Sequence, residues 1–305
     1  MAGQSETIGG VLELALGAAM PARAMILAER CLLARRTAPP DVPAAVRHAL
    51  AQVLGTVAAP SAMARTALAI GEAVERHGAA FPPGGEPAYH DRHHQAETVL
   101  AMGWLAGAAR RLGLLTTGQA ELAIAAMAGH DLLHDGQVPP ARGALELRSA
   151  DAAAEIGARE GLDTEALAAL RRTILATTWP WREEEAPDLV CRLAREADLF
   201  GSTMPELGPR LSRQLAIELA AAGQPAAESV AGHAARVALL RALPPASLPA
   251  RAIGLETLRA AQIEAYAGVA RRLGIAPPSA EAGAAALDAM DPADAQALLA
   301  WGGTA

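Results

Sequence analysis

Apolar residues recur mostly every three to four positions along this chain of 305 residues, and alternating runs of Val, Ile and Thr are essentially missing. A spacing of three to four residues is typical of amphipathic helices, whereas half-buried strands alternate with a period of two. The pattern therefore predicts an all-α fold, a bundle of many helices. We expect helices at 6–35, 42–56, 60–78, 92–112, 117–133, 145–159, 163–178, 187–200, 207–222, 226–242, 251–273, 279–288 and 292–301.

Proline pairs separate several of these segments, because proline lacks the backbone N–H and clashes with the preceding helical turn. Pro21 lies inside the first segment and predicts a kink or a split there. The stretch FPPGGEP at 81–87 is the strongest candidate boundary. We therefore expect a helical layer at 1–80 that packs on the rest or forms a homodimer contact, a domain with the chemistry at 81–275, and a helical extension at 276–305.

The composition narrows the classes of function. The net charge is −7 and every basic residue is an arginine, which argues against a nucleic-acid binder with a broad basic surface. The absence of lysine excludes P-loop nucleotide chemistry and Schiff-base catalysis, since both need that side chain. Aromatic residues make up only 3% of the chain, so we expect a core of closely packed Ala and Leu.

No segment has the pattern of a targeting or membrane-spanning sequence. The first apolar stretch contains Glu13 and follows Glu6 rather than a basic cluster, unlike a signal peptide. No uncharged apolar run approaches the ~20 residues that span a bilayer. Cys31 and Cys191 do not make a disulfide framework and fit a reducing compartment. These features predict a cytoplasmic protein without membrane contacts.

The histidines are clustered. Five of the eight lie between residues 90 and 134, namely His90, His93, His94, His130 and His134. A single histidine of this kind is more commonly a surface or core residue, and we interpret His93 as a surface residue. The clustering of the others indicates a functional site.

Two carboxylates accompany these histidines. Asp131 follows His130 at the end of the apolar run AELAIAAMAGH, so the pair should be carried into the interior. A buried carboxylate is costly without a partner, and an imidazole beside it suits a divalent ion such as Zn²⁺, Mn²⁺ or Fe²⁺. Asp198 ends another apolar segment and is the second candidate, unless it is a helix-end residue that faces solvent.

The order His94, His130-Asp131, Asp198 on an all-α scaffold resembles the HD superfamily of metal-dependent phosphohydrolases. Within that superfamily, YHDRHH at 89–94 followed by HDLLHDG at 130–136 resembles the class I cyclic-nucleotide phosphodiesterases, whose patterns are YHNxxH and HDxxHPG. The resemblance covers roughly residues 85–270.

The resemblance implies a role for each matching residue. The first metal ion (Zn, Mn or Fe) would be held by His94, His130, Asp131 and Asp198. Asp131 would also contact a second ion (Mg or Mn), and a hydroxide activated by the metals would attack phosphorus. His134 would hydrogen-bond water on the metal, His90 would protonate the leaving oxygen, and Tyr89 would support His90.

The chain also departs from this pattern. Asp91 and Asp135 replace the Asn and the Pro of the family motifs. Glu146 and Ser149 fit the ExxSA pattern of small bacterial HD phosphohydrolases, although Glu146 is equally well explained as a plain helix start. Thr177 lies in LATT, where the family has LATD.

Recognition of a nucleotide base is the least specific part of the resemblance. Gln262 is the best match to the glutamine that binds the base, and Tyr266 lies one residue later than the expected aromatic, which is replaced by Ala265. Both are otherwise ordinary helix residues. Trp179 and Trp181 would either line a pocket or be core or surface residues.

Three functions remain in competition at this point. The first is a phosphodiesterase that hydrolyses a nucleotide phosphodiester, cyclic or not, by metal-activated hydroxide. The second is an HD phosphomonoesterase acting on nucleotides or other small phosphates, which would share the metal site. The third is a degenerate helical sensor or interaction module, which should carry little bound transition metal.

Overall fold

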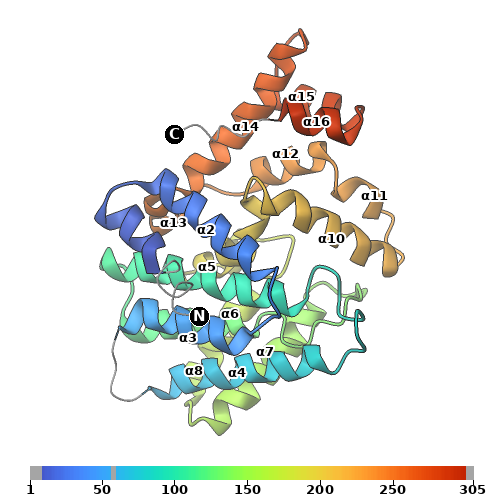
Figure 1. The fold of residues 1–305 in the computed structure, drawn as a ribbon. Helices are drawn as coiled ribbons and strands as arrows, with labels where there is room; N and C mark the ends of the chain where they lie inside the picture. Colours follow the sequence, from blue (N-terminus) through green and yellow to red (C-terminus); the bar gives the residue numbers. More distant parts are fainter. Residues whose placement is uncertain (1–8, 56–59, 300–305) are drawn as a thin grey trace.

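The computed structural model describes residues 9–55 and 60–299, and every regular element within these ranges is a helix. The all-α prediction is confirmed (Figure 1). The predicted helix ends at 6–8, 56 and 300–301 lie outside the described residues. The elements are η1 (Glu13–Gly17), α2 (Pro21–Arg35), α3 (Val42–Leu54), α4 (Ala62–Ala79), α5 (Arg92–Arg111), α6 (Thr117–Gly129), α7 (Ala144–Arg159), α8 (Thr164–Leu175), η2 (Glu183–Glu185), α9 (Leu189–Asp198), η3 (Gly201–Thr203), α10 (Leu207–Ala221), α11 (Ala227–Val230), α12 (His233–Ala242), α13 (Leu248–Ile253), α14 (Leu255–Arg272), α15 (Ala280–Asp288) and α16 (Pro292–Leu298).

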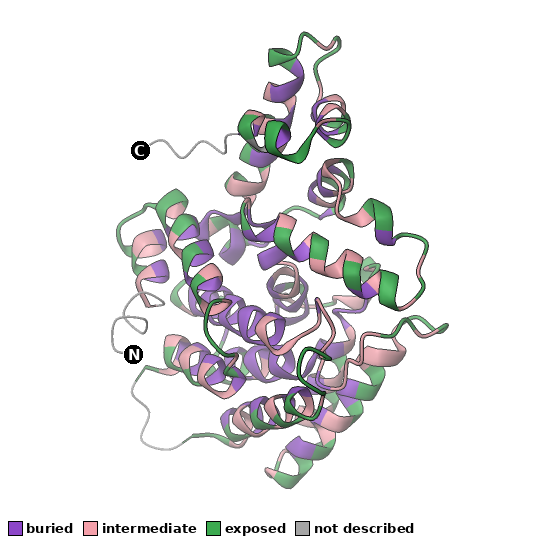
Figure 2. Cartoon of the chain, turned by 45° about the vertical axis from the view of Figure 1, so that its right-hand side comes forward, coloured by how far each residue is buried: buried purple, intermediate pink, exposed green. Residues whose placement is uncertain are grey.

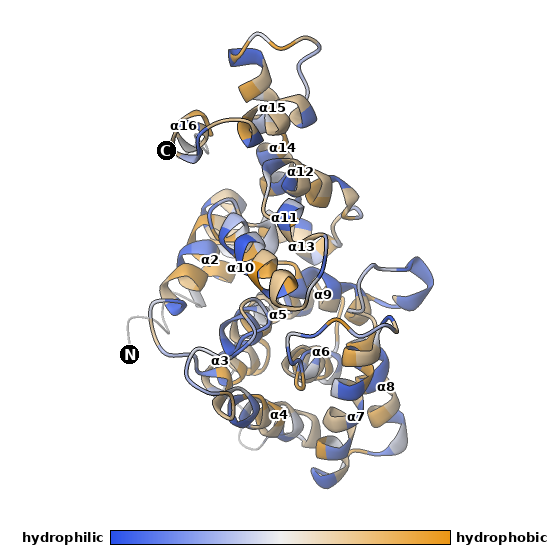
Figure 3. Ribbon diagram, turned by 90° about the vertical axis from the view of Figure 1, so that its right-hand side faces the viewer, coloured by the Kyte–Doolittle hydropathy of each residue, from blue (hydrophilic) through white to orange (hydrophobic). Residues whose placement is uncertain are grey.

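Two helices, α5 and α6, form the centre of the bundle. Figure 3 looks roughly along α6, which α3, α4, α5, α7, α8 and α9 surround and contact. Every residue of α5 from His94 to Ala109 is buried. The packing is close because small residues face each other: a Cβ at Gly103 would lie 2.8 Å from the Ala49 Cα of α3. Close approach of small residues is how a core with few aromatic side chains can be filled.

The first helices belong to the same core as the central ones. α3 packs on α5, α4 packs on α6, and one continuous cluster of buried side chains runs from Val11 to Leu255. The buried residues concentrate along these central helices (Figure 2). A second, smaller cluster joins α12, α14, α15 and α16 and contains Val237, Tyr266 and Leu287.

The predicted split at Pro21 is confirmed, because Pro21 begins α2 after a break. Several other predicted boundaries are wrong. The segments at 226–242 and 251–273 are each two helices, and the second divides at Gly254, whose φ of 101° favours glycine. α6 ends at Gly129 and α8 at Leu175, earlier than predicted. These early ends place 130–136 and 176–182 in turns.

Both cysteines are buried and unpaired. Burial raises the pKa of the Cys31 thiol to about 11, so this side chain is a small core residue rather than a reactive group. None of the described helices is both long and apolar enough to cross a membrane.

Candidate metal centre

Three helix ends meet at the predicted ligands. His94 lies in the first turn of α5, and the helix starts there because the Asp91 side chain accepts a hydrogen bond from the His94 backbone N–H (2.8 Å). His130 is the residue directly after α6, and Asp198 is the last residue of α9. The structure thus brings together residues that lie more than 100 positions apart.

The apolar sequences of α6 and α9 explain why these ends are inside the protein. α6 buries nine of its thirteen residues, and α9 buries one apolar face that includes Leu193 and Ala197. Both helices carry their C-terminal residues to the same place. The C-terminus of a helix bears a partial negative charge, so two such ends favour a cation between them.

The four predicted ligands lie close together. His130 Nε2 lies 3.1 Å from Asp131 Oδ2 and 3.5 Å from Asp198 Oδ1, while His94 Nε2 lies 3.6 Å and 3.5 Å from the same two oxygens. Both Nε2 atoms are buried without a hydrogen-bond partner in the described structure. His130 Nδ1 donates to the Met127 carbonyl (2.8 Å), which leaves the lone pair on Nε2. Three of these residues, His94, His130 and Asp198, have ligand atoms close enough together to hold a metal ion.

Without a metal, protons on the two histidines would compensate the negative charge of the two carboxylates. Burial alone would lower the pKa of His94, but Asp131 and Asp198 outweigh it and raise that pKa to about 9. The pKa of His130 is raised for the same reason, and the pKa values of both carboxyl groups are lowered despite burial because the imidazoles stabilise their charge. The two carboxylates therefore stabilise positive charge at this site, and a divalent cation would also supply such charge.

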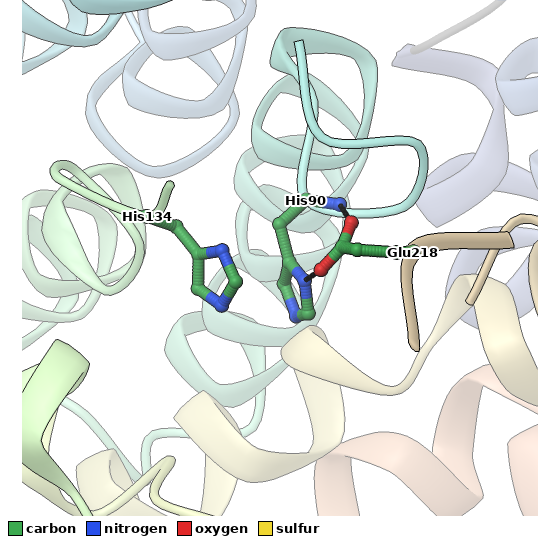
Figure 4. Close-up of side chains that lie close together, drawn as sticks. All are labelled: His90, His134 and Glu218. Carbon is green, nitrogen blue, oxygen red and sulfur yellow. Dashed lines mark hydrogen bonds and ion pairs between the residues drawn. The ribbon is translucent and has the colours of Figure 1, made fainter. Parts of the chain in front are cut away.

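A second group of side chains lies next to the first and comprises His90, His134 and Glu218 (Figure 4). The His90 Nδ1–H donates to Glu218 Oε1 (2.5 Å), and the backbone N–H groups of Tyr89 and His90 donate to Glu218 Oε2 (2.8 and 3.0 Å). The His90 and His134 rings are stacked, with centroids 3.7 Å apart and planes 21° apart. His90 precedes the helix that carries His94, at its N-terminal lip.

The ligand atoms of this second group also lie close enough together to hold a metal ion. Burial and the neighbouring His90 lower the pKa of His134 to about 4, which keeps that ring neutral. Burial alone would raise the pKa of Glu218, but its hydrogen bond to His90 lowers it to about 2. An ionised carboxylate thus holds the His90 ring in place.

The remaining residues predicted near the metal have distinct placements. Tyr89 is buried, its ring lies 4.7 Å from that of His94, and its hydroxyl pairs with Ser202 (3.1 Å). Burial raises the pKa of Glu146, and Asp131 and Asp198 raise it further. Ser149 and Thr177 are buried and bonded to the backbone, Ser149 accepting from Leu133 N and Thr177 donating to Ile174 O.

Gln262 and Tyr266 are used in the packing of α12 against α14. The Gln262 amide donates to the Thr203 carbonyl (2.7 Å) and accepts from Arg236 (2.5 Å), and its side chain is 1% exposed. Tyr266 is fully buried, and its hydroxyl lies 3.1 Å from His233 Nδ1. These contacts engage the Gln262 amide and the Tyr266 hydroxyl within the protein. Their role in binding a nucleotide base stays a prediction.

Sequence reasoning missed Glu218, which is 6% exposed and lies in the last turn of α10. Its signal was weak but present: in LAIELAA at 215–221, a single acidic residue stands among apolar ones. Arg36 was also missed. It forms two hydrogen bonds with the buried Glu97 (2.6 and 2.9 Å) and one with Gln214 (2.9 Å), and so ties the end of α2 to α5 and α10.

Comparison with known proteins adds no relative: no protein-family model matches the chain, and no curated protein matches it either. The chemistry of the site is therefore argued from its own residues and their geometry.

Proposed function

We propose that this protein is a metal-dependent phosphohydrolase of the HD type, acting on a small phosphodiester such as a cyclic nucleotide. One observation carries the proposal: two buried imidazole Nε2 atoms without hydrogen-bond partners in the described structure face two largely covered carboxylates, 9% and 18% exposed, at 3.1–3.6 Å. Uncompensated polar atoms of this kind are costly in a protein interior, and ligation of a metal removes that cost.

The residues that would hold the metals follow from this arrangement. His94, His130, Asp131 and Asp198 would bind the first ion, which we propose is Zn, Mn or Fe, and Asp131 would be shared with a second ion, Mg or Mn. When bound, such ions polarise phosphoryl oxygens and make a water acidic enough to act as the nucleophile near neutral pH.

The second group supports a proton donor for the leaving group. Glu218 fixes the orientation of the His90 ring through Nδ1, which leaves Nε2 as the atom that exchanges a proton with a departing oxygen. His134 stacks on this ring and limits its movement. A departing alkoxide needs such a proton, because it is a strong base.

The charges around the site favour a diester over a dianionic monoester. Arginines close to the site residues along the chain are already paired with carboxylates: Arg92 with Glu75 and Glu86, Arg148 with Asp135, and Arg195 with Glu185. None of these guanidinium groups is left without an acidic partner to neutralise extra phosphate charge. A phosphodiester brings one negative charge, whereas a monoester brings about two near neutral pH.

The test combines metal analysis with a substrate screen. The purified protein should contain divalent metal and, with added Mn²⁺, should hydrolyse bis(p-nitrophenyl) phosphate, cyclic AMP or cyclic GMP faster than p-nitrophenyl phosphate. His94→Ala should lose both metal and activity, while His48→Ala, which changes a histidine outside the cluster, should keep both. Metal-free protein without activity would refute the proposal, and a preference for the monoester would replace the diester by a monoester substrate.

A further inference from the structure

A large cavity lies along the outer face of α9, between the turn that follows α8 and the loop that precedes α13. Its volume is about 950 Å³, and its wall includes Trp179, Trp181, Arg192, Pro244 and Pro245. Pockets that bind small molecules have volumes of about 300–1,000 Å³ and mostly apolar walls. None of the lining residues belongs to the metal centre or to the group in Figure 4.

The aromatic part of the wall is rigidly held but incompletely covered. The Trp179 and Trp181 rings are 5.2 Å apart and nearly perpendicular, and Trp179 remains 50% exposed. Arg195 lies over the Trp181 ring at 5.5 Å and donates to the Ala176 and Arg182 carbonyls (2.7 Å each). These bonds fix the turn that carries both tryptophans, so the cavity is formed before any ligand arrives.

The polar part of the wall has more donors than the protein satisfies. Arg192 contacts the Pro245 carbonyl (3.3 Å) and has no ion-pair partner in the described part of the chain. Trp181 Nε1 is buried and lacks a hydrogen-bond acceptor in the same residues. A buried donor left unsatisfied costs about 1–3 kcal/mol.

Most of the acidic residues in the cavity wall already have hydrogen-bond or ion-pair partners within the protein. Asp188 caps α9 through the Cys191 N–H (2.9 Å) and also pairs with Arg172. Glu196 accepts from the N–H and the hydroxyl of Ser247 (2.6 Å each). Glu183 is exposed on η2 and has no such bond in the described structure. The charge of Arg192 acts on Glu196, whose pKa it lowers, but no carboxylate in the described structure forms an ion pair with it.

We propose that this cavity is a second ligand site, which binds a planar aromatic molecule with one negative charge. The aromatic rings of Trp179 and Trp181 contact the planar part, and the Arg192 guanidinium binds the anionic group. The site depends on no metal ion, so the inference stands or falls independently of the proposed phosphohydrolase activity.

Two dyes of similar shape test this inference on the full-length protein. The probe is 8-anilino-1-naphthalenesulfonate, an aromatic anion, and N-phenyl-1-naphthylamine is its uncharged counterpart. We expect saturable binding of one sulfonate dye per chain, with energy transfer from tryptophan. Arg192→Gln should weaken binding of the sulfonate dye about tenfold or more and leave binding of the uncharged dye unchanged. Trp179→Ala should weaken binding of both dyes by about 2–10-fold.

Three further variants serve as controls. Glu183→Gln should bind the sulfonate dye at least as tightly as the unchanged protein, because it removes one negative charge from the wall. Ile217→Ala alters an apolar residue that is 62% exposed elsewhere and should have no effect. His94→Ala should bind both dyes normally. The proposal would be overturned if dye binding were not saturable, or if Arg192→Gln lowered the affinity for both dyes equally.

Discussion

The bond between His90 and Glu218 gives a stability prediction that can be worked out from the structure. Glu218 is 6% exposed and accepts three hydrogen bonds, from two backbone N–H groups and from His90 Nδ1. Its pKa falls from the ordinary value of 4.5 to about 2, because these donors outweigh the effect of burial. Each pKa unit corresponds to about 1.4 kcal/mol, so the ionised carboxylate stabilises the fold by roughly 3 kcal/mol.

The sign of the pH dependence follows from the direction of this shift. The folded-state pKa is depressed, so the stabilisation is complete above the unfolded pKa of about 4.5 and is lost as the pH falls toward about 2. Glu218→Gln keeps the shape of the side chain but removes its charge. We expect a loss of about 2–3 kcal/mol at pH 7, with less than half of it remaining at pH 3.

The assay is urea unfolding of metal-free protein, followed by circular dichroism between pH 7 and pH 3. Glu264→Gln is the matched control, because Glu264 is 68% exposed and pairs only with Arg271 on the surface. That variant should change stability by no more than about 0.5 kcal/mol. A loss for Glu218→Gln as small as the control's, or one that does not decrease with acid, would refute the reasoning.

Three further predictions follow from the same structure. Asp131→Ala should abolish metal binding and hydrolysis and keep the helical circular dichroism spectrum; activity with full metal occupancy would contradict the site. His90→Ala should slow hydrolysis of a cyclic nucleotide by about 10²–10⁴ and barely affect bis(p-nitrophenyl) phosphate, since p-nitrophenolate leaves without a proton. Metal content should not change, and equal losses on both substrates would assign His90 another role. A chain that begins at Phe81 should aggregate or unfold at lower temperature, because α3 and α4 cover α5 and α6; an equally stable, monomeric fragment would show this wrong.

The sequence alone was sufficient for the fold class and for the first set of ligand candidates. Helical periodicity is a local property, so it predicted the helices even where their ends were misplaced. The run before His130 was apolar over more than two turns, and this alone indicated that the His130-Asp131 pair would be buried. The clustering of histidines between 90 and 134 likewise needed no structure.

What the sequence could not provide was the contact between distant side chains. Glu218 lies 128 residues from His90, and Arg36 lies 61 residues from Glu97, so no local pattern relates them. The early end of α6 and the close approach of α9 decide that His130 and Asp198 face one another. A hydrogen bond or a ligand set depends on distances of a few ångströms, and only the packing of the helices determines these.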